Sequence, residues 1–317
     1  MKSGRLNISS SSGKRRYGWG NLRRIVQSVA FLGFLILIMS ARYPVNPEIY
    51  HNALVKFSPF TQLFLAMRQA GNNPSLLLLI VIVLIFAFTG RGFCGWLCPV
   101  GTGLDVYNRL VGKRFRRKNR DVKTESLRWK YNILIASIIC LVFGVSLYWL
   151  LDPTAMFTRN TALVVAPVID TTARETTRAL SGLPNVGYEI EKAMRTVFNP
   201  LPVRSLYFWF FLGLLIFIFL LEIFALRFFC KVICPLGGFL GYLSNFSFIR
   251  LRIDDLSCIS CNRCIKACKT SAMSSKDKLS IDNRECVLCL ACIEACEYTG
   301  LSVRFEKLSF VRNSDNF

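Results

Sequence analysis

The sequence contains very little histidine and none of the common hydrolytic or nucleotide-binding motifs. His51 is the single histidine among 317 residues, so the chain cannot supply both axial ligands of a bis-histidine haem. It also has no nucleophilic triad, phosphate-binding glycine loop or HExxH zinc site. These absences exclude a haem held by two histidines of this chain, hydrolysis by a triad, and phosphate-loop nucleotide chemistry.

Acidic residues are also scarce, with 19 Asp and Glu against 40 Lys and Arg and a formal net charge of +21. Residues 1–24 carry seven of the basic residues and no acid, which predicts a basic cytoplasmic tail. Tails of this kind often bind nucleic acid, but an apolar run follows directly here, so no nucleic-acid partner is expected. The apolar content of 53% is high for a soluble protein and predicts membrane lipid as a partner.

Eight cysteines near the C-terminus form two runs of one pattern, C-x2-C-x2-C-x3-C. This spacing is typical of proteins that hold two [4Fe–4S] clusters, in which the fourth cysteine of each run binds the cluster of the other run. The sequence therefore predicts a cluster 1 with ligands Cys258, Cys261, Cys264 and Cys296. It predicts a cluster 2 with ligands Cys286, Cys289, Cys292 and Cys268.

Zinc and disulfides are the alternatives for these eight thiols. Zinc sites usually contain two separated C-x2-C pairs, unlike the three closely spaced cysteines found here. Disulfides need an oxidising compartment, and this segment is predicted to be cytoplasmic. One departure from the usual cluster pattern is that Lys269 and Glu297, rather than proline, follow the fourth cysteines.

Four apolar segments are long enough to suggest membrane spans. They are residues 25–41, 74–89, 131–151 and 206–224. The segment between the second and third spans carries eleven basic residues in 91–130, whereas the outer loops 42–73 and 152–205 are much less basic. The positive-inside rule then predicts a multi-pass protein of the bacterial cytoplasmic (inner) membrane with both termini in the cytoplasm.

The second and fourth apolar segments are each followed by the same phrase, R-x-F-C-x3-C-P-x-G-x2-L, at an offset of 136 residues. The repeated cysteines are Cys94, Cys98, Cys230 and Cys234. An internal duplication of this kind predicts that the two motifs meet across a pseudo-twofold axis. Each proline suits the first turn of a helix, so Cys98 and Cys234 are predicted to precede helix starts. The four thiols are candidates for a third iron–sulfur cluster, for redox-active dithiols, or for ligands of a metal in transit.

The order of these motifs resembles the NapH/NosR polyferredoxin family over nearly the whole chain. The resemblance is closest to the NapH type, because only 24 residues precede the first apolar segment. It implies a quinol dehydrogenase membrane component that takes electrons from the quinone pool. The electrons would pass to other electron-transfer subunits of a reductase complex, such as that of periplasmic nitrate reductase. Other members of the family serve the maturation of redox enzymes.

The predicted architecture is a four-transmembrane-helix bundle built as an internal duplication, followed by a small α+β ferredoxin-like domain. The expected boundaries are a tail at 1–24, a membrane domain at 25–250, a 2[4Fe–4S] domain at 251–305 and a second tail at 306–317. Quinol oxidation needs a proton acceptor, and Glu222 is the candidate because it is the single acid within a predicted span. Two alternative functions stay open: a factor that reduces metal or thiols during assembly of a partner enzyme, and an iron–sulfur redox sensor.

Overall fold

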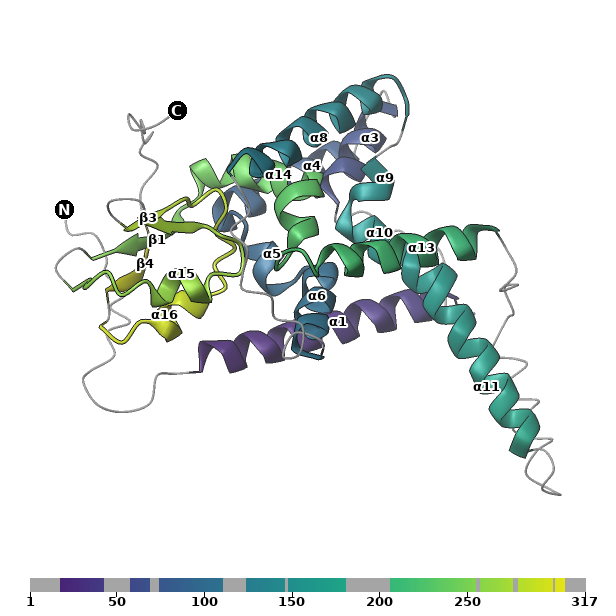
Figure 1. The fold of residues 1–317 in the computed structure, drawn as a ribbon. Coiled ribbons are helices and arrows are strands. Elements are labelled where there is room, and N and C mark those ends of the chain that lie inside the picture. Colours follow the sequence, from purple (N-terminus) through teal and green to yellow (C-terminus); the bar gives the residue numbers. More distant parts are fainter. Residues whose placement is uncertain are drawn as a thin grey trace.

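A computed structural model describes most of the chain, with gaps at both ends and in the longer connections. The described residues are 18–42, 58–68, 74–110, 124–145, 148–180, 206–254, 257–275, 279–298 and 300–305. Helices occupy the N-terminal four-fifths of the chain, and a small unit with both strands and helices forms the C-terminal part (Figure 1). The predicted tail at 306–317, most of the tail at 1–24, and His51 lie outside the described residues.

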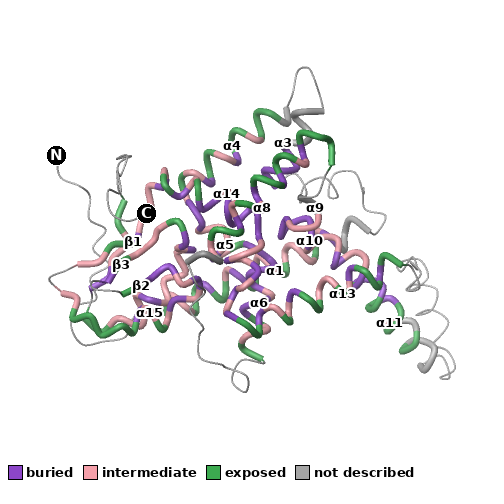
Figure 2. Tube along the Cα trace, turned by 45° about the horizontal axis from the view of Figure 1, so that its top comes forward, coloured by how far each residue is buried: buried purple, intermediate pink, exposed green. Residues whose placement is uncertain are grey.

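Four apolar helices are the longest hydrophobic elements. They are α1 (Trp19–Arg42), α4 (Pro74–Thr89), α8 (Thr124–Val142) and α13 (Leu206–Leu221). Many of their large apolar side chains are exposed, as the green stretches along α4, α8 and α13 show (Figure 2). They pack mainly on shorter helices: α4 on α3 (Pro59–Arg68), α8 on α14 (Pro235–Leu243), and α1 on α6 (Pro99–Leu110).

The predicted four-transmembrane-helix bundle is wrong. By length and composition, α1 is the one described helix able to cross a membrane, over Trp19–Ile38. Helices α4 and α13 have 16 residues each and span about 24 Å, less than the roughly 30 Å of a hydrocarbon core. The third apolar segment is not one helix, because α8 ends at Val142 and the chain turns through Gly144 at φ 80°. The multi-pass topology with cytoplasmic termini is therefore not supported.

Shorter helices fill the centre of the molecule and carry the repeated motifs. They are α5 (Gly92–Trp96), α9 (Tyr148–Leu151), α10 (Pro153–Asn160), η1 (Thr161–Val165), α11 (Ala166–Leu180), η2 (Phe229–Ile233) and η3 (Ser244–Phe246). Leu104 of α6 and Leu240 of α14, which match in the repeat, are 1% and 0% exposed in one shared core. The two halves of the repeat therefore pack against each other.

The C-terminal unit has the predicted ferredoxin-like composition of short strands and helices. Its elements are β1 (Ile249–Ile253), α15 (Arg263–Ala267), β2 (Met273–Ser275), β3 (Leu279–Ile281), α16 (Ala291–Ala295) and β4 (Leu301–Phe305). Strands β1 and β4 are antiparallel, with Ile253 opposite Leu301. Strands β2 and β3 form a second antiparallel pair. Leu251, Met273 and Leu301 enclose a separate small core that includes the cysteines of both runs.

Candidate functional site

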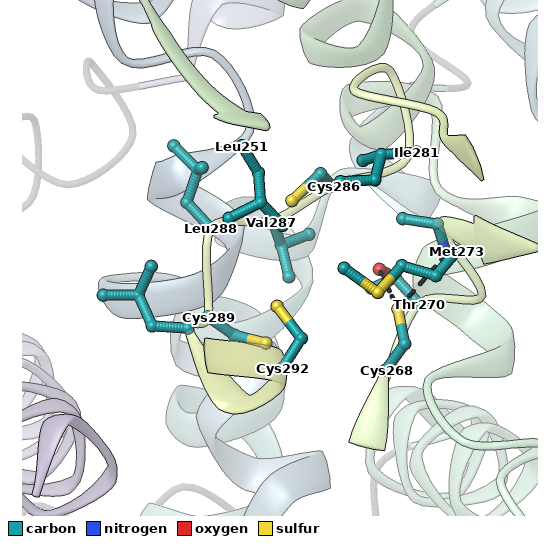
Figure 3. A pocket seen from close by; sticks show the side chains of 12 residues that line it. Leu251, Cys268, Thr270, Met273, Ile281, Cys286, Val287, Leu288, Cys289 and Cys292 are labelled. Carbon is teal, nitrogen blue, oxygen red and sulfur yellow. Dashed lines mark hydrogen bonds between the residues drawn. The ribbon is translucent and has the colours of Figure 1, made fainter. Parts of the chain in front are cut away.

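Four cysteines surround a cavity in the part of the C-terminal unit that faces the helices. Cys286, Cys289 and Cys292 come from the second run, and Cys268 comes from the end of the first run. Figure 3 shows their sulfur atoms directed toward one shared space. We call these four residues the inner quartet. They are the four ligands that the crossed pairing assigns to cluster 2.

A second cavity is lined by Cys258, Cys261, Cys264 and Cys296, which we call the outer quartet. Cys261 is exposed, and its neighbours Ile259 and Tyr298 are 59% and 48% exposed. The outer quartet therefore lies at the surface of the unit, whereas the inner quartet lies toward the helical part of the molecule. Each cavity is lined by four cysteines together with apolar side chains, which is consistent with the same group in both.

The two cysteine runs fold in the same way. Ser260 and Leu288, each two residues after a first cysteine, have φ of 54° and 48°. Asn262 and Leu290, four residues after it, have φ of 59° and 58° and precede the short helices α15 and α16. A left-handed φ costs a residue with a side chain on the order of 1 kcal/mol. The matched strain indicates that each run must turn tightly around the space between its thiols.

The residues of both quartets fit a [4Fe–4S] cluster. Four thiolates are the ligands of such clusters, and here they are spread around a cavity rather than gathered on a point. Among the described residues, no group of three or more Cys, His, Asp or Glu side chains is close enough to hold a single metal ion. When bound, each cluster would supply one-electron redox chemistry, and the cavity residues would set its exposure to water.

The crossed pairing leads to a direct prediction. Cys268→Ser and Cys292→Ser are expected to remove the same cluster, although the two residues belong to different runs, because both line one cavity. Cys296→Ser and Cys264→Ser are expected to remove the other cluster. EPR spectra of the four reduced variants should therefore fall into two identical pairs. A residual spectrum of Cys268→Ser that matches Cys264→Ser would contradict the crossing.

The four cysteines of the repeated motifs, which we call the repeat cysteines, lie together in the core between the two halves. Cys98 and Cys234 are 4% and 3% exposed and directly precede α6 and α14, as predicted from the prolines. Each donates its backbone N–H to the carbonyl five residues earlier, at 3.0 and 2.9 Å. The Cys234 sulfur also accepts the Gly237 N–H at 3.3 Å, so the backbone at this helix start offers a donor to the sulfur.

The arginines of the motifs cross between the halves. Arg227 donates from Nη1 to the Cys94 carbonyl at 3.3 Å, and Arg91 donates from Nη2 to the Cys230 carbonyl at 3.4 Å. A Cβ atom at Gly101 or Gly237 would lie 3.0 Å from the same carbonyls, so glycine leaves the room for this approach. The reciprocal contacts give the site the pseudo-twofold arrangement that the sequence repeat predicts.

Comparisons with known proteins agree with this duplicated site. A family model described as a 4Fe-4S binding domain matches the chain twice, at residues 74–118 and 207–253, and each match contains one pair of repeat cysteines. The methylamine utilization ferredoxin-type protein MauN of Methylorubrum extorquens is 23% identical over 263 residues, 80% of this chain and 76% of that protein. These similarities support a ferredoxin-type polyferredoxin family for the chain. The family-level prediction is thus confirmed, while assignment to the NapH type stays a prediction.

Other relatives of this chain align over shorter regions. The putative electron transport protein YccM of Escherichia coli is 24% identical over 62% of this chain and 48% of its own length. Two uncharacterised proteins of Methanocaldococcus jannaschii are each 26% identical, over 60% and 59% of this chain. The chain spans 63% and 55% of the length of those two relatives. No solved structure matches the chain.

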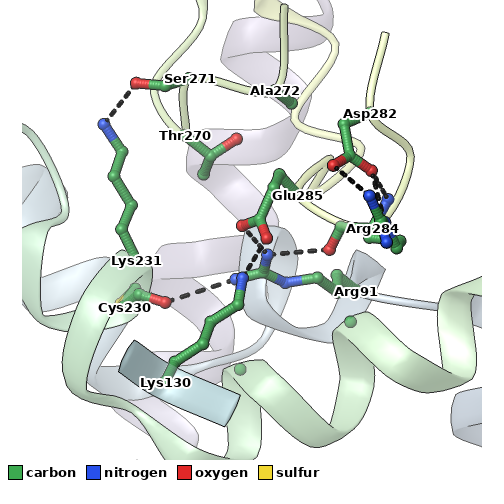
Figure 4. Close-up of polar contacts among 12 residues, drawn as sticks. Arg91, Lys130, Cys230, Lys231, Thr270, Ser271, Ala272, Asp282, Arg284 and Glu285 are labelled. Atoms are coloured by element: carbon green, nitrogen blue, oxygen red, sulfur yellow. Dashed lines mark hydrogen bonds and ion pairs between the residues drawn. The ribbon is translucent and has the colours of Figure 1, made fainter. Parts of the chain in front are cut away.

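Two buried acids organise the positive charge around the repeat cysteines. Asp105 accepts from Arg23 at 2.5 Å and from Arg227 at 2.9 Å, and Lys269 lies 3.2 Å away. Glu285 pairs with Arg91 at 2.7 Å and with Lys130 (Figure 4). The first acid belongs to the repeat, whereas the second belongs to the ferredoxin-like domain.

These charges oppose the effect of burial on the pKa values. Burial raises the pKa of Cys94, and the positive charges of Arg91 and Arg227 counteract the rise. The pKa of Cys230 is raised to about 12, again by burial with Arg227 opposing. Burial would also raise the pKa of Asp105, but Arg227, Lys269 and Arg23 hold it well below its usual value.

Glu222 lies outside helix α13, which ends at Leu221. The chain does not continue as one helix from Glu222 to Cys230, because it turns between them and Arg227 has φ 55°. The Glu222 Oε1 atom accepts from the Arg227 N–H and from Asn108 Nδ2, each at 2.5 Å. Its Oε2 atom is buried and has no partner among the described residues.

The sequence did not identify several residues that build this site. Asp105 and Asn108 follow the first motif, Lys130 belonged to a predicted basic loop, and Glu285 was a loop acid beside a cysteine. The one available signal was a difference between the two copies of the repeat: Asp105 of the first copy corresponds to Gly241, which is not acidic, in the second. Nothing in the sequence indicated that Lys130 and Glu285 would meet.

Proposed function

We propose that this polyferredoxin carries electrons at a membrane from quinol, through iron–sulfur clusters, to a partner of a respiratory reductase system. The arrangement of the three cysteine groups carries the proposal. The repeat cysteines lie in the core, the inner quartet lies beside them, and the outer quartet reaches the surface. A row of redox sites from a buried core to an exposed edge is suited to electron relay.

Backbone contacts bring the inner quartet beside the first motif. The Trp96 Nε1 atom donates to the Leu288 carbonyl at 2.9 Å, and a Cβ atom at Gly95 would lie 2.1 Å from the Val287 carbonyl. Val287 and Leu288 also line the cavity of the inner quartet. We therefore place cluster 2 next to the repeat cysteines and cluster 1 at the exit toward a partner protein.

A third cluster held by the repeat cysteines is supported by the buried charge around them. The fully or nearly buried basic residues there are Arg23, Arg91, Lys130, Arg227 and Lys231, and the buried acids are Asp105, Glu222 and Glu285. Around this site five buried cations thus face three buried anions, while the other buried acids of the described residues, Asp152 and Asp170, belong to the start of α10 and to α11. Uncompensated buried charge is costly, and four thiolates around a [4Fe–4S] core carry net negative charge that offsets it.

The burial of Cys98 and Cys234 works against an exchangeable dithiol, because each C-x3-C pair then has one buried and one partly buried thiol. Cys98 and Cys234 are 4% and 3% exposed, so a thiol of a partner protein has no direct access to them. A factor that reduces the thiols of another enzyme needs a reactive and accessible cysteine. The names of the relatives, a ferredoxin-type protein and a putative electron transport protein, also favour electron transfer.

Membrane lipid is the proposed cover for the exposed apolar helices. Leu77 of α4 is 68% exposed, Trp209 of α13 is 61% exposed and Phe143 after α8 is 80% exposed. Continuous apolar surface of this kind is rare on soluble monomers. Helix α1 is the proposed anchor, since it alone among the described helices has the length and apolarity to cross a bilayer.

Glu222 is the proposed proton acceptor for quinol. Its Oε2 atom is buried without a partner among the described residues, while Ile223 and Phe224 beside it are 43% and 64% exposed. A carboxylate next to apolar surface is suited to accept a proton from a hydrophobic quinol. Glu222→Gln is expected to slow anaerobic reduction of the clusters by a quinol analogue by about 100-fold, measured by stopped-flow absorbance.

The control for this experiment is Glu297→Gln, which removes an exposed acid of the ferredoxin-like domain. This variant should be reduced by quinol at the wild-type rate, and dithionite should reduce the clusters in every variant. Quinol reduction at an unchanged rate in Glu222→Gln would remove Glu222 from the mechanism. No reduction of the wild-type protein by quinol would overturn the proposed quinol donor itself.

A further inference from the structure

The two halves of the repeated site differ at a position that governs the crossing arginines. At the offset of 136 residues, Asp105 corresponds to Gly241. Asp105 binds Arg227 of the opposite half at 2.9 Å, whereas Gly241 has no side chain to offer Arg91. The contacts of the two arginines with the cysteine carbonyls are equivalent in the two halves. The two halves therefore differ in the acid that binds the arginine.

A residue of the ferredoxin-like domain takes the place of the missing acid. A Cβ atom at Gly241 would lie 3.1 Å from the Arg284 carbonyl and 3.9 Å from Arg91 Cδ. The backbone just before Glu285 therefore occupies the space that a side chain at position 241 would need. Arg91 Nη1 donates to the Arg284 carbonyl at 3.0 Å and to Glu285 Oε2 at 2.7 Å. Lys130 binds the other oxygen of Glu285, as Figure 4 shows.

The same short segment carries a cluster ligand. Glu285 directly precedes Cys286 of the inner quartet. Arg91 thus contacts the Cys230 carbonyl on one side and the acid beside Cys286 on the other. All of these groups are buried: Arg91 is 1% exposed, Lys130 0% and Glu285 4%. Charges in such a position are screened little by water.

We propose that the ferredoxin-like domain completes the repeated site and that Glu285, Arg91 and Lys130 form a charge link between it and the inner quartet. Glu285 supplies the acid that Gly241 lacks, which fixes where cluster 2 sits. The link positions and tunes cluster 2 and leaves cluster 1 unaffected. The inference rests on the proposed function in taking the inner quartet as the ligands of a cluster.

The charge link has a sign that can be measured. Reduction adds negative charge to a cluster, so a nearby carboxylate lowers its potential and a nearby cation raises it. Glu285→Gln is therefore expected to raise the potential of cluster 2, and Lys130→Met is expected to lower it. The expected size is about a tenfold change in the ratio of reduced to oxidised cluster at fixed potential, or about 59 mV for one electron.

Redox titration followed by EPR, on the intact chain with its clusters, tests the proposal. The matched control is Glu297→Gln, because Glu297 directly follows the outer ligand Cys296 but pairs with Arg263 in the open, with side-chain exposures of 48% and 53%. Exposed ion pairs contribute little to electrostatic energies, so this variant should leave the reduction potential of cluster 2 unchanged. The proposal would be overturned if the potential of cluster 2 shifted in the same direction in Glu285→Gln and Lys130→Met, or if both clusters shifted equally. Loss of packing alone would not give shifts whose sign follows the charge removed.

A second measurement covers the case in which Glu285→Gln fails to fold. Lys130→Met leaves the Arg91 to Glu285 pair intact, so its downward shift alone tests the link. An unchanged cluster 2 in this variant would refute it. Neither titration needs a third cluster or a quinol. Failure of the proposed quinol relay would instead show as clusters that quinol does not reduce, with the opposite-sign shifts still present.

Discussion

Replacing Cys94 and Cys230 together with serine is expected to lower the iron content of the anaerobically purified protein from about twelve to about eight atoms per chain. The two residues come from opposite halves and their carbonyls accept from the crossing arginines, so both are needed for one shared site. Iron and acid-labile sulfide analysis, with EPR of the reduced protein, measures the change. The signals of the two quartets should remain.

The control for the double variant is Cys140→Ser. Cys140 lies on α8 and belongs to neither quartet nor the repeat cysteines, so the iron content should stay at about twelve. About eight irons in the wild-type protein would show that the repeat cysteines hold no cluster. The proposed third site would then be lost, and a metal-handling role for the four thiols would return as the better explanation.

Gly95→Ala is expected to displace the ferredoxin-like domain from the helices. A Cβ atom there would lie 2.1 Å from the Val287 carbonyl, a backbone atom that cannot rotate away. Overpacking of this kind costs about 1–3 kcal/mol or more, and the strain falls on the contact that holds the inner quartet beside the repeat. We expect faster proteolysis between the two parts and a lower melting temperature.

Gly103→Ala provides the matched control for this substitution. Gly103 also lies within the first motif, but a Cβ atom there meets nothing within 4 Å. Alanine inside a helix is favoured over glycine by up to about 1 kcal/mol, so Gly103→Ala should be neutral or stabilising. Equal protease resistance of Gly95→Ala and Gly103→Ala would contradict the close docking of the domain at Gly95.

The cysteine patterns predicted more of this protein than the hydrophobic patterns did. The spacing of the two runs predicted which four cysteines line each cavity. This was possible because the crossed ligation follows from the order of the cysteines along the chain. The apolar segments, in contrast, predicted four spanning helices where the third breaks near Gly144 and α13 ends at Leu221. Hydropathy counts apolar residues but does not show where a helix ends.

The sequence by itself determined the duplicated motif, the eight-cysteine pattern and the helix starts after Cys98 and Cys234, since these depend on local spacing and on proline. Only the tertiary structure decided which charges surround the thiols. Glu285 lies 194 positions from Arg91 and 155 from Lys130, and no local pattern links residues that far apart. Their meeting follows from the docking of one domain on another, which depends on the shape of both surfaces.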